Sequence, residues 1–170
     1  QLLQRHDNDD RLLAFLLLNA FTPRVQLAAA LNLPETWVAE RLPRLKQRYE
    51  RAFCLSSRPG VGHFIDEPEE KRIILLANLL KKDPLLIPLP GITRANIDRL
   101  NVACEKLNEF PLISGEYLAS LVLAVYALRN QLCGSWPECR YASLKNAVEQ
   151  GGVYLGENAF RTLIGLLEIR

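Results

Sequence analysis

Prolines divide this chain into a first part that contains turn signals and a later part whose pattern is helical throughout. The segment "DPLLIPLPG", residues 83–91, carries prolines at 84, 88 and 90. Proline removes a backbone donor and clashes with the preceding helical turn, so no regular helix crosses this segment. From Thr93 onward the apolar residues recur at helical spacing. We therefore interpret the segment as the boundary between two domains.

The first third of the sequence predicts three helices followed by a β-hairpin. The first helix is predicted over 8–20, after Asx residues that can cap it. Pro23 opens a second helix over 23–31, "LNLP" makes a tight connection, and a third helix runs over 34–52. The turn residues "RPGVG" separate two short strands, 53–57 and 63–66. This order predicts a winged helix-turn-helix domain over 1–66.

The rest of the chain predicts a connector and an all-helical bundle, so the expected fold class is mainly α. Residues 67–90 hold one helix, to about residue 83, and the proline-rich linker. Further helices are predicted at 93–109, 115–132, 140–150 and 157–169. These form a helical domain over 91–170. Because the sequence still has a helical pattern at its last residues, we expect this domain to be truncated at its C-terminal end.

Composition and motifs exclude several classes of protein. No apolar run approaches the roughly 18 to 20 residues of a membrane span. The four cysteines match no disulfide framework or zinc ligand set, so we expect free thiols in a cytoplasmic protein with no metal or cofactor. The chain has no GxSxG, Walker, GxGxxG or HExxH motif, so we expect no enzyme. The net charge is only +2, and residues 1–66 hold nine basic and seven acidic residues, which is weak for a nucleic-acid binder.

The order of these elements, together with "TPRVQLAAALNLPETWVAERLPRLKQRYER" and "LVLAVYALRNQL", resembles BglG/MtlR-like bacterial transcription regulators that carry regulation domains of the sugar phosphotransferase system (PTS). The resemblance implies the second of two helix-turn-helix domains, followed by most of a first PTS regulation domain (PRD). It implies a homodimeric regulator of a sugar-utilisation operon, with operator DNA as partner.

The resemblance also concerns phosphorylation. The family's "DHxxFAxxR" motif matches "LVLAVYALR", residues 121–129, where Arg129 fits but Leu121 and Val122 replace the aspartate and histidine. The only histidines are His6 and His63, so the PRD is degenerate and has no phosphorylation site in this chain. Contact with PTS proteins would then involve regions outside it. Candidate dimer surfaces are the apolar face of 157–169 and a set in the helix over 115–132, namely Tyr117, Leu118, Leu121 and Leu128.

Candidate DNA contacts are the polar and basic residues of the second and third helices and of the hairpin. Glu35 and Glu40 oppose binding, because carboxylates beside phosphates reduce affinity. The alternative is therefore a protein-interaction or dimerisation module, with DNA bound by an upstream helix-turn-helix. Trp37 stacks on DNA sugars, forms part of an interface, or is half-buried against the first helix. The hairpin residues Arg58 and His63 either contact phosphates or are solvated. The set is Arg24, Thr36, Trp37, Arg41, Arg44, Lys46, Arg48, Arg58 and His63.

Pro43 lies inside the predicted third helix. An interior proline costs about 3 kcal/mol or more. We expect either a kink near residues 40–42 or a separate helix that begins at Pro43. Both shorten the element that would enter a DNA groove.

Overall fold

The computed structural model describes residues 6–19, 21–89, 91–107, 114–131, 146 and 157–168. The chain divides into two compact units, residues 1–68 and residues 69–170. Helices predominate, and the two described strands form one antiparallel sheet. The prediction of a mainly α protein is therefore confirmed.

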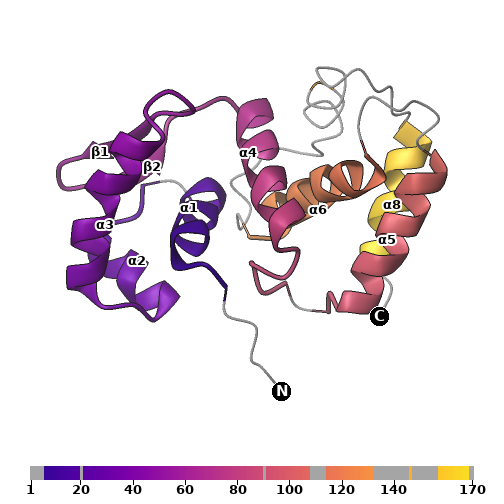
Figure 1. The fold of residues 1–170 in the computed structure, drawn as a ribbon, viewed down its shortest axis with the longest axis horizontal. Coiled ribbons are helices and arrows are strands. Elements are labelled where there is room, and N and C mark those ends of the chain that lie inside the picture. Colours follow the sequence, from indigo (N-terminus) through magenta and orange to yellow (C-terminus); the bar gives the residue numbers. More distant parts are fainter. Residues whose placement is uncertain are drawn as a thin grey trace. The chain divides into compact units, whose positions relative to one another are not determined.

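The first unit contains three helices and a hairpin in the predicted order (Figure 1). Helix α1 spans Asn8–Leu18, α2 spans Arg24–Leu31 and α3 spans Glu35–Arg48. Strand β1, Leu55–Arg58, pairs with β2, Gly62–Ile65, so that Leu55 lies opposite Ile65. Helix α3 ends four residues before its predicted limit. The chain turns there, because the N–H groups of Ala52 and Phe53 both donate to the Tyr49 carbonyl.

Local hydrogen bonds explain where these helices begin and end. The Asp7 side chain accepts from the Asp10 N–H at 3.1 Å and caps the start of α1. Asn32 adopts the left-handed conformation, φ 53°, at the end of α2. The Arg11 guanidinium donates to the Leu31 carbonyl at 2.9 Å. A cation thus satisfies a terminal carbonyl of α2 and links α1 to it.

Helix α3 is continuous through Pro43. The alternative in which Pro43 begins a separate helix is therefore not observed. Pro43 is exposed, so its ring lies away from the core while its nitrogen leaves the Ala39 carbonyl without the usual helical donor. The helix keeps 14 residues, a length of about 21 Å.

The hairpin is joined to the segment between α1 and α2. The backbones of Thr22 and His63 exchange two N–H···O hydrogen bonds, each 2.9 Å long. Gly62 has φ +133°, and a Cβ atom there would lie 2.5 Å from the Thr22 carbonyl carbon. This close approach requires glycine. The core beneath contains apolar residues from every element, including Leu12, Leu16, Leu27, Val38, Leu42, Leu45, Leu55 and Ile65.

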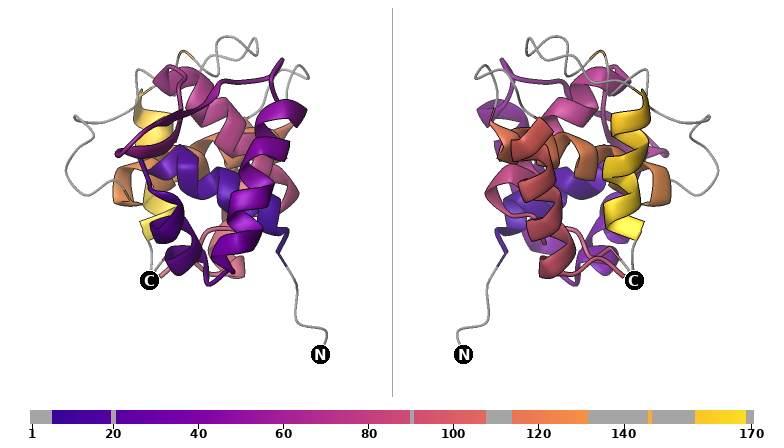
Figure 2. Two further views of the ribbon diagram at one scale, coloured as in Figure 1. Left: turned by 90° about the vertical axis from the view of Figure 1, so that its left-hand side faces the viewer. Right: turned by 90° about the vertical axis from the view of Figure 1, so that its right-hand side faces the viewer.

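The second unit is helical. Helix α4 spans Glu69–Lys82, α5 spans Arg94–Leu107, α6 spans Gly115–Gln131 and α8 spans Glu157–Glu168. Helix α6 packs against the other three, and α5 and α8 lie side by side (Figure 2). The predicted connector helix, α4, thus packs against α6 within this unit. The predicted helix at 140–150 lies outside the described residues except for Asn146.

Helix α6 is buried on all sides from residue 118 to residue 128. A helix that is apolar all round is a core helix. Leu118, Leu121 and Leu128 are at most 1% exposed, so the prediction that they form a dimer surface is wrong. Val122, which stands at the position of the family's histidine, is fully buried. The side chain of Arg129 lies outside the described part of the chain.

Candidate nucleic-acid interface

Helix α3 presents one polar face to solvent. Val38, Leu42 and Leu45 are buried, which orients the helix on the core. The opposite face, at helical spacing, carries exposed side chains that can contact a ligand. The members of this outward face are Thr36, Glu40, Arg44 and Gln47.

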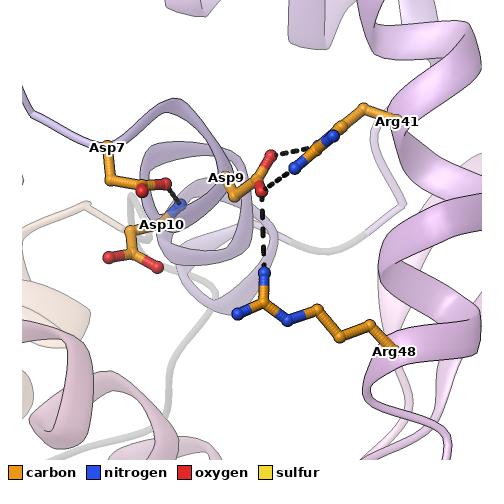
Figure 3. Close-up of polar contacts among 5 residues, drawn as sticks. All are labelled: Asp7, Asp9, Asp10, Arg41 and Arg48. Carbon is orange, nitrogen blue, oxygen red and sulfur yellow. Dashed lines mark hydrogen bonds and ion pairs between the residues drawn. The ribbon is translucent and has the colours of Figure 1, made fainter.

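Arg41 is held by Asp9 of α1 (Figure 3). Its Nε and Nη2 atoms donate to the two carboxylate oxygens at 2.6 and 2.5 Å. The Asp9 side chain is only 11% exposed, and Nη1 of Arg48 lies 3.9 Å from its Oδ2 atom. The hydrogen bond to Asp9 raises the pKa of Arg41, so its guanidinium stays charged. The pair ties α3 to α1 and directs Arg41 away from the outward face.

Trp37 lies next to this pair and is half-buried. The Arg41 guanidinium is 5.9 Å from the centre of its ring, within cation–π range. Trp37, Arg41 and Arg48 thus form the side of α3 that faces α1. Arg48 is 64% exposed, so it can turn toward an anion in solvent.

Arg24, at the start of α2, lies 3.3 Å from Glu35 at the start of α3. Both side chains are about half exposed, so the pair contributes little and exchanges readily. It neutralises Glu35, one of the two glutamates expected from the sequence to oppose DNA binding. Glu40 remains on the outward face.

The hairpin holds Arg58 on an aromatic support. The Arg58 guanidinium lies 5.2 Å from the ring centre of Phe21 and 6.0 Å from that of Phe64. The two rings are 4.5 Å apart, centre to centre. Cation–π attraction keeps the arginine at the exposed surface of the hairpin with its charge in solvent.

His63 is half-buried on β2. Burial is the main cause that lowers the pKa of its imidazole, and the charge of Arg24 lowers it further. His63 is therefore mostly neutral at pH 7, because its pKa lies below the ordinary value of 6.5. It lines a cavity between α3 and the hairpin, together with Arg24 and Lys46.

The predicted residues thus lie in three places. Thr36 and Arg44 are on the outward face, Trp37, Arg41 and Arg48 face α1, and the cavity or hairpin holds the other four. The sequence interpretation missed Gln47, whose 3-residue spacing from Arg44 places it on the same face. It also missed Asp9 and Phe21, whose partners are distant in sequence and carry no local signal.

Two features are absent from the part of the chain that the structure describes. No described helix combines the length and apolarity needed to cross a membrane. Within the same residues, no group of three or more histidine, cysteine, aspartate or glutamate side chains is arranged to hold a metal ion.

Comparison with known proteins finds one close relative. The chain is 69% identical over 168 residues to an Escherichia coli (strain K12) protein described as "Putative frv operon regulatory protein". The match covers 99% of this chain but 29% of the relative's length. No protein-family model and no solved structure matches the chain. The chain is therefore closely similar to one section of a much longer protein that is described as an operon regulator.

Proposed function

We propose that this chain is part of a transcriptional regulator and that its first unit is a winged helix that binds operator DNA. The relative's description supports a regulatory role. Three helices and a hairpin, with a short turn between α2 and α3, support the winged-helix assignment. In such domains the second helix of the helix-turn-helix enters the major groove.

The outward face of α3 is the observation that carries this proposal. Arg44 and Gln47 make no ion pair or side-chain hydrogen bond with other described residues, so both are available to base edges. Arginine pairs with guanine and glutamine with adenine, each through two hydrogen bonds. An α-helix such as α3 has a diameter of about 10–12 Å with its side chains, so it fits a major groove about 12 Å wide.

Phosphate contacts would come from either side of this face. Lys46 and Arg58 are exposed cations on α3 and on the hairpin. Arg48 is the third, because its long contact with Asp9 leaves most of its side chain in solvent. Arg41 has a different task in this proposal: it fixes the orientation of α3 on α1 and does not read bases.

The second unit is, on this proposal, a helical regulation domain of a cytoplasmic, PTS-linked regulator of sugar use. The family resemblance supports this assignment. Signals from PTS proteins would reach the protein through regions outside this chain, because residues 67–170 contain no histidine. The regulator would act as a homodimer without catalytic activity.

A second candidate is a module for dimerisation or protein interaction, with DNA bound by another domain. Glu40 favours it, because a carboxylate in the middle of the outward face would approach phosphates. The weak net charge of residues 1–66 points the same way.

Binding of the 170-residue chain to duplex DNA separates the two candidates. The probe is the region upstream of its own operon, with a scrambled duplex as reference, titrated between about 50 and 200 mM salt. A DNA-binding unit shows a steep loss of affinity with salt. Arg44→Ala should weaken specific binding by about 1–3 kcal/mol and relax the sequence preference.

The matched control is Arg99→Ala, which removes the same charge from an exposed position on α5. It should leave affinity close to that of the unmodified chain. Equal effects of the two variants, or no measurable binding to either duplex, would exclude α3 as the reading element and favour the interaction module.

A further inference from the structure

A cavity of about 370 Å³ opens between α3 and the hairpin of the first unit. One wall comes from α3, the other from β1 and β2, and the start of α2 contributes at the edge. Its volume is at the lower end of the range for small-molecule sites. The lining residues are Arg24, Ala39, Leu42, Pro43, Lys46, Leu55, Ser56, Ser57 and His63.

The polar lining is suited to an anion. Arg24 and Lys46 bring two positive charges from different helices. Ser57, which lies opposite His63 in the hairpin, adds a hydroxyl donor from β1, whereas the Ser56 hydroxyl lies 3.1 Å from the Cys54 Sγ atom. No aspartate or glutamate is among the described lining residues. Cationic and hydroxyl donors that converge from separate elements are the usual partners of phosphate oxygens.

The electrostatics of His63 agree with a site of positive potential. The charge of Arg24 lowers the pKa of the imidazole in addition to the effect of burial. Lys46 is the other charged group of the lining. A bound anion would offset both cations, and would therefore favour the protonated imidazole, which then donates a further hydrogen bond.

The apolar part of the lining indicates the kind of molecule to which the anionic group is attached. Leu42 and Leu55 are buried apolar residues of the lining, and Ala39 and Pro43 add further apolar surface. Such a surface accommodates the carbon skeleton of a sugar better than a fully hydrated ion. The combination of donors and apolar lining therefore fits a phosphate attached to an organic group.

We propose that this cavity binds a phosphate ester, with Lys46 and Arg24 supplying the charge and the Ser57 hydroxyl and His63 completing the donors. Arg24 can leave Glu35, because their exposed ion pair is weak. The ester has two possible sources: the backbone of duplex DNA, an assignment that rests on the proposed function, or a free phosphate monoester.

The test follows the imidazole of His63 by NMR in the labelled 170-residue chain. Inorganic phosphate, ribose 5-phosphate and the duplex are the three probes, each compared with chloride at equal ionic strength. His6, the other histidine, is the internal reference. Phosphate probes should raise the pKa of His63, shift its resonances in a saturable way and leave His6 unchanged.

Lys46→Gln is the decisive variant and Lys106→Gln, an exposed position on α5, is its control. Removing a charged donor should weaken phosphate binding roughly tenfold. Lys46→Gln should do so and Lys106→Gln should not. The proposal is overturned when no probe perturbs His63 or when the two variants behave alike.

The duplex and ribose 5-phosphate titrations distinguish the DNA backbone from a free monoester as the source of the phosphate. Weaker duplex binding by Lys46→Gln, without a response to ribose 5-phosphate, assigns the site to the DNA backbone. A response to ribose 5-phosphate in a chain that binds no duplex assigns the site to a free monoester. In that second case the phosphate site stands and the DNA-binding function fails.

Discussion

Replacing Pro43 by alanine tests how α3 accommodates a proline. Pro43 is the ninth of 14 residues in the helix, so both its own position and that of Ala39, four residues earlier, lie inside the helix. The alanine N–H would donate to the Ala39 carbonyl and complete the backbone ladder. Because Pro43 is exposed, the exchange removes no core packing.

The gain in stability has a lower and an upper bound. The restored hydrogen bond alone contributes about 1 kcal/mol. The full difference in helix propensity between proline and alanine is about 3 kcal/mol, and it includes relief of the clash with the preceding turn. We expect the free energy of unfolding of the first unit to rise by about 1–3 kcal/mol. Even the lower value raises the melting temperature of so small a unit by roughly 4–8 °C.

Trp37 fluorescence provides the assay, because this residue is half-buried in α3. The only other tryptophan, Trp136, is replaced by phenylalanine so that denaturant unfolding reports on the first unit alone. Arg44→Ala, one residue beyond the proline and also exposed, serves as control and should change stability little. A Pro43→Ala variant no more stable than the control would refute the reasoning, since it would mean that the helix bears no cost at this position.

Three further outcomes are expected. Asp9→Ala should destabilise the first unit and free the Arg41 side chain. The NMR signal of the slowly exchanging guanidinium proton of Arg41 should then be lost. An unchanged signal would show that Asp9 does not hold Arg41 in place. Gly62→Ala should lower stability more than Gly60→Ala, because both have positive φ but only Gly62 meets backbone within 3 Å; equal losses in denaturant titrations would contradict this. Burial raises the pKa of Cys104 to about 12, so its thiol should react with a disulfide reagent only after unfolding, and rapid labelling of the native chain at pH 8 would contradict its burial.

Local sequence signals were sufficient for the secondary structure of the described residues. The Asx cap before α1, the prolines before α2 and α3, and "RPGVG" between the strands each act within a few residues of their own position. Helical spacing likewise predicted α4, α5, α6 and α8. Errors were largest at the end of α3, where a turn around Tyr49 replaced the last predicted residues.

The candidate interface was predicted less well, because charge type alone does not tell which way a side chain points. Arg41 and Arg44 are alike in sequence, three residues apart on α3. One is bound to Asp9 and the other is on the outward face. Residues three apart are neighbours on a helix surface, only about 60° apart, so helical spacing does not assign them to different faces. The position of α1 decides which of the two arginines meets a carboxylate.

The sequence by itself thus determined the helices, the hairpin and the absence of any histidine from residues 67–170, because these depend on residue identity and on neighbours along the chain. Only the tertiary structure decided the partner of Arg41 and the burial of Leu121 and Val122. It alone also brought Arg24, Lys46 and His63 to one cavity. These features require contacts between residues far apart in sequence, and such contacts form only when the helices and the hairpin pack on a shared core.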